Sequence, residues 1–493
     1  KVALTPMLTS LTLLNHVNVD TEEEMLGYGI GIILLNIGMY FVAPSMVIIR
    51  IKNYISNIWL NADSKMLESY SKNNIFTSFI SIFSLFVIGI ILLSVIFPAL
   101  IISNLGVHSN TLDSFEIGQN ASIILLGNIV IFSLSIIYYK NKFPKSIQDS
   151  ISKILQKNLS KKITIIIIIT ILIPYVAFTT PEIFLNEADQ APDYEIFLAA
   201  KEIFPFGKTT FTEAAEQNDR YVRMLLLITS LEVFQNVKLL PFLSSIALLL
   251  ITYIFTNEIT KNRKAGIISF LFLIQSYTFL KYDSFAMYEN FWVLFYVLSL
   301  YLIYKKFYTS CISYALSIFT KAFTAIFLPL SVVFVLYSDL KRKTKFLLLA
   351  TYGIMFGVVI AIWSADASVY DSILRIDITQ FLIALTKASY QLRFDNLFLI
   401  GLLPLTIGLI IKVKHGINIA VPILFLITGS LFAGAIVEML SDHFVTLPYR
   451  FVPTILFFAI GVGVLFSHKK EEKLWELLIK INLFCFLEYS VFF

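Results

Sequence analysis

Residues 163–173 read Ile-Thr-Ile-Ile-Ile-Ile-Ile-Thr-Ile-Leu-Ile, and this stretch decides the fold class. It carries no charge, and its apolar side chains do not alternate with polar ones. Strands of a transmembrane barrel do alternate, so the stretch does not fit a barrel strand. A helix needs about 20 mainly apolar residues to cross the hydrocarbon core of a membrane. Since the uncharged run continues to residue 180, it predicts a membrane-spanning helix at 163–180.

The composition of the whole chain agrees with this stretch. Of the 493 residues, 57% are hydrophobic and 14% are charged, and the mean hydropathy is +0.80. Soluble domains are about 25% charged, and this chain has too little polar surface to cover one core in water. A soluble enzyme, a nucleic-acid-binding protein and a disordered protein are therefore excluded. The expected fold class is all-α, a polytopic transmembrane helical protein whose partner is the lipid bilayer.

Apolar stretches long enough to form spans recur along the chain. Segment 308–338 is too long for one helix, and we expect it to break near Thr320-Lys321 into two short helices. The tail 474–493 is a weaker last span. Together with 163–180 and the remaining candidates, this gives about 14 crossings. The remaining candidates are 27–49, 75–103, 119–139, 239–256, 265–280, 290–304, 346–364, 397–411, 417–436 and 451–467.

Basic residues gather in seven loops that the order of spans places on one side of the membrane. These loops hold 25 of the 38 Lys and Arg residues. Cytoplasmic loops carry an excess of Lys and Arg, so we assign this side to the cytoplasm. The assignment is consistent only if 308–338 forms a hairpin. The loops are 50–73, 140–162, 257–264, 305–306, 339–345, 412–414 and 469–473.

The opposite, external side carries two long loops. Loop 181–223 contains nine acidic residues. Arg220–Gln235, which begins in this loop and continues beyond it, is a candidate helix at the membrane surface. Loop 365–396 has apolar residues near helical spacing, which predicts another surface helix. A lipid-linked substrate would meet such helices at the external interface. The spaced residues are Ile373, Ile376, Phe381, Ala384 and Leu385.

Three carboxylates of loop 181–223 follow the span 163–180 closely. They are Glu187, Asp189 and Asp193, here called the acidic group. A carboxylate at a membrane surface can take a proton from an acceptor hydroxyl or bind a divalent cation. The competing interpretation is a solvated acidic loop. The five histidines show no metal-binding spacing, and no cofactor is expected.

Four polar side chains at the predicted external ends of later spans form the second candidate set. They are Arg450, Lys321, Tyr449 and His443, here called the basic cluster. A cation in an apolar stretch indicates function, and an Arg can bind two phosphate oxygens at once. The competing interpretations are that Lys321 extends to water and that Arg450 and Tyr449 only anchor a helix at the interface.

Taken in order, these residues resemble the GT-C superfamily of membrane glycosyltransferases, in particular the branch of protein O-mannosyltransferases and lipid A aminoarabinose transferases. Asp189-Gln190-Ala191 followed by Tyr194 resembles the acidic motif after the first span of that branch. Ala315-Leu316-Ser317-Ile318-Phe319-Thr320-Lys321 resembles its small-residue helix ending in Thr-Lys. Pro448-Tyr449-Arg450-Phe451-Val452-Pro453 resembles its late segment with Arg and Tyr before a Pro-containing helix.

The likeness covers about residues 160–467. If Asp189 is the base, Gln190 stands where the family has the second acid of a pair; if Glu187 is instead the second acid, Asn186 stands where the family has the first. Residues 1–160 match nothing in the family. The resemblance divides the chain into 1–160, a three-span region of unknown role; 161–467, a GT-C-like module; and 468–493, a basic loop with the last span. The chain is either a diverged enzyme or a relative that kept the fold and lost activity.

The resemblance implies inverting transfer of a sugar from a polyprenyl-phosphate donor to a protein or lipid hydroxyl, at the external face of a prokaryotic plasma membrane. In this interpretation the acidic group, first of all Asp189, removes the proton of the acceptor hydroxyl. The basic cluster binds the lipid phosphate. The alternative is a non-catalytic subunit that packs against other membrane proteins through residues 1–160. A transporter is less favoured, because the spans 27–49 and 75–103 contain no ionisable residue.

Overall fold

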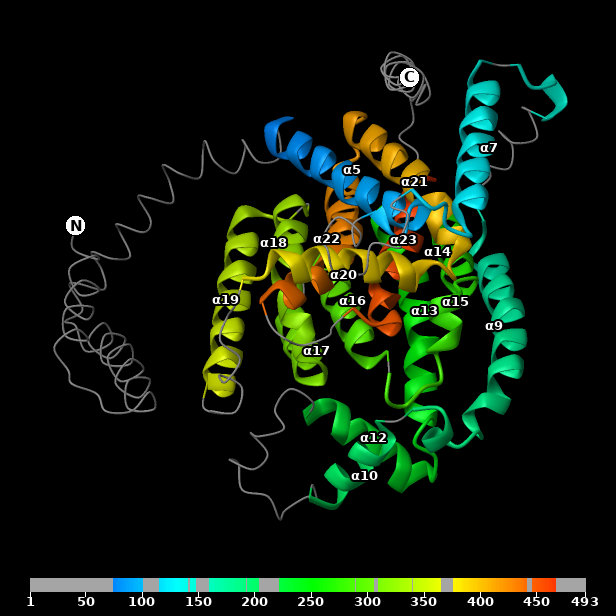
Figure 1. Cartoon of the computed structure of the whole chain (residues 1–493). Helices are drawn as coiled ribbons and strands as arrows, with labels where there is room; N and C mark the ends of the chain where they lie inside the picture. Colours follow the sequence, from blue (N-terminus) through cyan, green and yellow to red (C-terminus); the bar gives the residue numbers. More distant parts are fainter. Residues whose placement is uncertain are drawn as a thin grey trace, which may run out of the picture. The chain divides into compact units, whose positions relative to one another are not determined.

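The structure is a computed structural model that describes residues 74–100, 115–140, 142–147, 159–191, 193–203, 221–288, 290–305, 309–338, 340–364, 376–440 and 446–466. By their internal contacts, residues 1–73 and 74–493 form two units, and all described residues belong to the second. Every regular element in these ranges is a helix (Figure 1), which confirms the all-α class for the described residues. The candidate spans 27–49 and 474–493 lie outside them.

The helices follow one another closely along the chain. In order they are α5 (Asn74–Ile96), α7 (Ala121–Tyr139), α9 (Lys161–Ile183), η2 (Glu187–Asp189), α10 (Tyr194–Ile203), α12 (Tyr221–Phe234), α13 (Leu239–Thr260), α14 (Arg263–Ile274), α15 (Tyr277–Lys281), α16 (Phe291–Tyr304), α17 (Ser310–Thr320), η4 (Ala322–Phe327), α18 (Leu328–Tyr337), α19 (Arg342–Ser364), α20 (Ile378–Leu392), α21 (Asn396–Lys414), α22 (Ala420–Leu440), η6 (Pro448–Phe451) and α23 (Val452–Leu465).

Polar side chains fix the starts of several helices. Ser160 Oγ accepts a hydrogen bond from the Ile163 backbone amide at 3.3 Å and begins α9. Asn262 does the same for α14, and Asp377 for α20. The first amides of a helix have no partner within it, so a side-chain oxygen at this position stabilises the helix by about 1 kcal/mol.

Six of the described helices are long and apolar enough to cross a membrane. This length and composition are those of an integral membrane protein. Shorter apolar helices lie at 121–137, 291–304, 310–320 and 322–337. The total of about 14 crossings stays a prediction. The six long helices are Phe76–Ile96, Lys161–Ile183, Leu239–Thr260, Asn396–Lys414, Ala420–Leu440 and Pro448–Leu465.

Helix α23 lies at the centre of the packing, and α5, α7 and α9 lie at its outside. Every residue of α23 from Val452 to Val464 is buried, and a helix that is apolar all round belongs in a core. By contrast, Phe79 of α5, Leu126 of α7 and Ile166 of α9 are each about 60% exposed. Exposed apolar side chains can pack against lipid acyl chains, so the outward apolar faces of these three helices suit contact with a bilayer.

The expected break in segment 308–338 is confirmed. Helix α17 ends at Thr320, and Lys321 has an extended backbone with φ −155° and ψ 113°. The 3-10 turn η4 follows before α18 begins at Leu328. Lys321 therefore sits at the junction of two short helices.

The expected single helix at 265–280 is wrong, because the chain forms α14 and α15 with a break at 275–276. Asp395 accepts hydrogen bonds from the backbone amides of Tyr277 and Thr278, both at 2.9 Å. Ser276 Oγ accepts a further bond from the Phe279 amide at 3.1 Å. These acceptors cap a new helix start, and so the amides of α15 do not continue the hydrogen bonds of α14.

Helices form where surface helices were expected in the two long loops. Helices α10 and α12 contact each other and lie together at the bottom of Figure 1, below α13 and α16. Helix α20 packs on α5 and α22 through Ala384, Leu385 and Ala388. The position of these helices at a membrane surface stays a prediction.

One end of the bundle, here called the basic end, is formed by residues 159–162, 258–264, 305 and 466. Glu258 pairs with Lys305 at 2.8 Å and with Lys261 at 2.5 Å. Arg263 Nη1 donates to the Leu159 carbonyl at 3.0 Å, which ties the start of α14 to the start of α9. Residues of three predicted cytoplasmic loops therefore lie at this end: 140–162, 257–264 and 305–306.

Candidate functional site

Four segments that are distant in sequence meet at the opposite end of the bundle, here called the acidic end. They are 182–193, 282–290, Lys321 and 446–451. Backbone amides of the second segment bond to a carboxylate of the first. A tyrosine ring of the second stacks on one of the fourth, and Lys321 lies over that same ring. Helices α9 and α13 each join the acidic end to the basic end.

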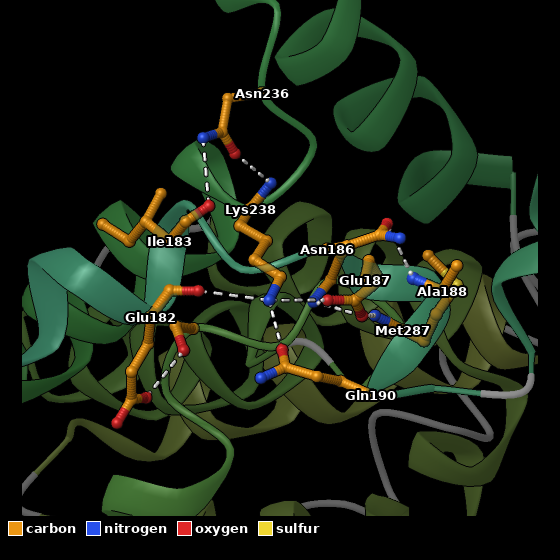
Figure 2. Close-up of polar contacts among 11 residues, drawn as sticks. Glu182, Ile183, Asn186, Glu187, Ala188, Gln190, Asn236, Lys238 and Met287 are labelled. Carbon is orange, nitrogen blue, oxygen red and sulfur yellow. Dashed lines mark hydrogen bonds and ion pairs between the residues drawn. The ribbon is translucent and has the colours of Figure 1, made fainter.

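Glu187 is the buried member of the acidic group. It opens η2 and is 3% exposed. Its Oε1 accepts hydrogen bonds from the backbone amides of Ala286 and Met287, each at 3.0 Å. Its Oε2 forms an ion pair with Lys238 Nζ at 3.3 Å, in which both side chains are 1% exposed (Figure 2).

Lys238, the residue before α13, joins several chain segments of this region. Figure 2 shows its Nζ directed at Glu187, at the carbonyl oxygen of Glu182 and at the side-chain oxygen of Gln190. The carbonyl lies 3.2 Å away. Asn236 adds a bond to the Ile183 carbonyl at 3.1 Å. The end of α9 and the turn after it are thereby tied to the start of α13.

The enclosure of Glu187 alters its acidity. Burial raises the pKa of its carboxyl group above the ordinary value, because an isolated charge is costly in a medium of low polarity. The amides of Met287 and Ala286 and the charge of Lys238 act in the opposite direction but are the smaller effect. Glu187 is therefore enclosed within the protein, with its two oxygens directed at partners on other segments.

Asp189 and Asp193 are exposed, in contrast to Glu187. Asp189 ends η2, and the next residue turns its amide oxygen to Lys238. This neighbour, Gln190, is a neutral hydrogen-bond acceptor for Lys238. Asp193 precedes α10, and its carbonyl accepts the Phe197 amide at 3.1 Å. These two carboxylates are the members of the acidic group that solvent or a substrate can reach.

Tyr288 connects the acidic group with the basic cluster. Its ring stacks on Tyr449 with a centroid separation of 4.5 Å and an interplanar angle of 17°. Burial raises the pKa of the Tyr288 hydroxyl, and the charge of Asp193 raises it further. Tyr194, the residue after Asp193, packs against the same apolar cluster as Tyr288. Arg223 lies on the same side, since its Nη2 donates to the Met287 carbonyl.

Two cations flank the Tyr449 ring. Lys321 Nζ lies 4.6 Å from the ring centroid, and the Arg450 guanidinium lies 5.8 Å from it and 5.1 Å from the Phe323 ring. Arg450 Nε is buried and has no hydrogen-bond partner among the residues that the structure describes. Buried donors are normally paired, so this atom is available to an anion placed between the two cations.

The structure thus brings Lys321, Arg450 and Tyr449 together, with Tyr288 stacked on Tyr449. The described ion pairs do not join Asp189 or Asp193 to these cations. His443 lies outside the described residues.

Sequence reasoning missed the parts played by Lys238 and Asp283. Lys238 directly precedes the uncharged run 239–256, and such a cation is usually expected to extend to water. Asp283 is 1% exposed, and Thr179 Oγ1 donates to its Oδ2 at 3.4 Å. Burial raises the pKa of Asp283 to about 7. The position of Lys238 at a span boundary was the one available signal.

No cluster of three or more His, Cys, Asp or Glu that could hold a metal ion occurs in the described part of the chain. Compared with known protein families, with curated proteins and with solved structures, the chain matches none of them.

Proposed function

We propose that the chain is an inverting glycosyltransferase that takes a sugar from a polyprenyl-phosphate donor at the acidic end, on the external side of the membrane. One observation carries the proposal. Lys321 and Arg450 flank one tyrosine ring, and this ring stacks on Tyr288. Tyr288 packs against the same apolar cluster as Tyr194, the neighbour of Asp193 in sequence. An anion site for a lipid phosphate and a carboxylate for an acceptor hydroxyl are thereby adjacent.

The reaction uses these two sets of residues in one step. A carboxylate of Asp189 or Asp193 accepts the proton of the acceptor hydroxyl. The hydroxyl oxygen bonds to the anomeric carbon as the bond from that carbon to the phosphate oxygen breaks, which inverts the anomeric centre. The released polyprenyl phosphate gains one negative charge, and Lys321 and Arg450 offset it.

Glu187 has a different task in this proposal. Its buried ion pair with Lys238 and its bonds to Ala286 and Met287 fix the acidic turn against segment 282–290. That segment carries Tyr288, so the pair sets the distance between the acids and the basic cluster. A site must hold its groups within fractions of an ångström to accelerate a reaction.

The alternative function is a non-catalytic membrane subunit. It is favoured by the outward apolar faces of α5 and α7, which suit protein partners as well as lipid. In that case Lys321 and Arg450 would anchor the helix ends, and no substitution of Asp189 or Asp193 would change a transfer reaction.

A transfer assay tests the proposal. Full-length chain in proteoliposomes is given polyprenyl phosphates carrying mannose, glucose or aminoarabinose, together with a serine-containing peptide or a hydroxyl-bearing lipid as acceptor. The released polyprenyl phosphate and the glycosylated acceptor are measured. We expect Asp189→Asn or Asp193→Asn to lower release by about 10²–10⁴-fold, because the amide cannot accept the proton. Glu195→Gln, at an exposed acid of α10, is the matched control and should retain activity. Full activity in both Asn variants would end this mechanism.

A further inference from the structure

A pocket lies away from the candidate site, between the end of α5, the turn 118–120 and α20. Its volume is about 260 Å³. Ligand pockets for drug-sized molecules are usually about 300–1,000 Å³, so this one suits a compact group. The hydrogen bond from Asn120 Nδ2 to the Arg393 carbonyl closes it on one side.

The walls of the pocket are held in fixed positions. The Gly118 amide donates to the Ile96 carbonyl at 2.8 Å, which brings the turn against the end of α5. A side chain at Gly118 would meet the Val95 carbonyl oxygen at 2.4 Å, so only glycine allows this approach. On the opposite wall, α20 packs on α5 and α22.

The charged residues that line the pocket are Lys387 and Arg393, and its described lining contains no acid. Lys387 pairs with Glu438 at 3.1 Å, behind the lining. Because the Lys387–Glu438 pair carries no net charge, the net charge at the pocket is the one positive charge of Arg393. Its guanidinium stacks on Tyr390 at 3.2 Å and on Phe394 at 4.3 Å, which fixes its position at the rim.

Ser94 provides an independent sign of a binding site. It lines the pocket, it is 2% exposed, and its Oγ has no hydrogen-bond partner in the described part of the chain. Ser81 in the same helix instead donates to the Thr77 carbonyl at 2.8 Å. A buried hydroxyl normally finds a partner, so Ser94 is free to donate to an acceptor inside the pocket.

Apolar side chains continue outward from the pocket. Leu93 of α5 and Ile123 of α7 are 48% and 44% exposed, and Ile117 of the turn is 71% exposed. Such surfaces suit acyl chains rather than water. The combination of a compact cationic pocket and flanking apolar faces suits an amphiphile with one negative head-group charge.

The geometry points to a binding site for the phosphodiester head group of an anionic membrane phospholipid, separate from the transfer site. Arg393 binds the phosphate, Ser94 donates to one of its oxygens, and the acyl chains lie along α5 and α7. The lipid thereby joins the 74–139 region to α20. This inference does not depend on the proposed glycosyltransferase activity.

Native mass spectrometry on the detergent-purified full chain tests the inference, with dioleoylphosphatidylglycerol and dioleoylphosphatidylcholine as probes. We expect one saturable phosphatidylglycerol, bound about tenfold more weakly by Arg393→Gln and a few-fold more weakly by Ser94→Ala. Ser94→Ala removes only a hydroxyl without a partner, so it keeps the test valid if Arg393→Gln disturbs the fold. Lys281→Gln removes an exposed cation outside the pocket and should bind like the parent chain.

Three results would overturn the inference. The first is equal phosphatidylglycerol binding by the parent chain and both pocket variants. The second is equal binding of phosphatidylcholine, which carries no net charge. The third is displacement of the lipid by millimolar inorganic phosphate in an Arg393-dependent manner, because the pocket would then hold a free anion rather than a lipid.

Discussion

The side chains of Glu187 and Lys238 carry the strongest energetic statement at the residue scale. Both are 1% exposed, and they form an ion pair at 3.3 Å. Removal of one member of a buried pair leaves a charge without its partner and typically costs about 3–5 kcal/mol. We expect Lys238→Met to lower the free energy of unfolding by that amount, measured by chemical unfolding in detergent.

Lys201→Met is the matched control. Lys201 pairs with Glu232 at 2.6 Å, but the two side chains are 31% and 60% exposed. Exposed pairs contribute about 0–1 kcal/mol. Equal losses of unfolding free energy in the two variants would show that the Glu187–Lys238 ion pair stabilises the protein no more than an exposed ion pair does.

Asp283 makes stability depend on pH in a direction opposite to that of most carboxylates. Its pKa is raised from 3.8 to about 7. Between these values the folded chain binds the proton that the unfolded chain has released, so this residue lowers stability as pH rises from about 4 to 7. The full effect is on the order of 4 kcal/mol. We expect Asp283→Asn to remove this slope and to be the more stable chain at pH 8.

Unfolding midpoints of the parent chain and Asp283→Asn across pH 4–8 provide the measurement. Asp377→Asn is a suitable comparison, because Asp377 caps α20 near the surface through its bonds to two backbone amides. Parallel curves for the parent chain and Asp283→Asn would contradict the assigned environment of Asp283.

Some residues of the site were visible in the sequence and others were not. Lys321 and Arg450 stand out as cations at the ends of apolar stretches, where an unneeded charge is costly. The partnership of Glu187 and Lys238 was hidden, because 51 positions separate them and Glu187 is one of nine acids in its loop. Only the packing of the turn after α9 on segment 286–287 selects Glu187 from the nine acids of its loop.

At the scale of elements, α23 approaches α13 and α14 closely at Gly463, near its end. A methyl group at Gly463 would meet Ser269 Oγ at 2.1 Å and the Ala265 carbonyl oxygen at 2.7 Å. Overpacking typically costs about 1–3 kcal/mol. We expect Gly463→Ala to destabilise the protein by this amount, measured by thermal unfolding in detergent, although alanine favours a helix.

Gly353 of α19 offers the control, since nothing lies within 4 Å of a methyl group added there. Gly353→Ala should stabilise the chain by about 0.5–1 kcal/mol through helix propensity alone. A stabilising Gly463→Ala would mean that α23 and α14 are farther apart than the structure shows.

Helix breaks differ in how far they can be predicted. The break at Lys321 follows from local sequence, because 308–338 is too long for one crossing. The break at 275–276 depends on Asp395, which is 118 positions from Tyr277 and accepts its amide hydrogen. A local pattern contains no information about such a distant acceptor, so 265–280 was expected to form a single helix.

At the scale of the whole molecule, the opposite characters of the two ends predict a topology. The acidic end should be external and the basic end cytoplasmic. In intact cells, a membrane-impermeant maleimide should label Glu195→Cys above the parent chain, whereas Lys261→Cys should react only after the cells are opened. Both positions are exposed, so burial does not protect either one. The reverse pattern would invert the side assigned to the site.

The all-helical class could be predicted from composition, because long uncharged runs leave a helix as the simplest way to satisfy the backbone in a bilayer. From the distribution of charge, the sequence predicts that the four segments of the acidic end lie on the same side of the membrane. It does not predict that they contact one another. Their contacts, such as the stack of Tyr288 on Tyr449, depend on how α16 and α23 pack, and no spacing in the sequence specifies this.

The central claim is that Arg450 and Lys321 form a phosphate site, and Arg450 tests it most directly. Equilibrium binding of undecaprenyl phosphate to the purified full chain is measured for the parent, Arg450→Ala and Arg450→Lys, with Arg263→Ala at the basic end as control. We predict that Arg450→Ala loses about 1.5–3 kcal/mol of binding free energy. Arg450→Lys should recover only part of this loss, because Lys cannot bind two phosphate oxygens in a planar fork. Unchanged binding in both Arg450 variants would show that Arg450 is an interfacial anchor and would contradict the account.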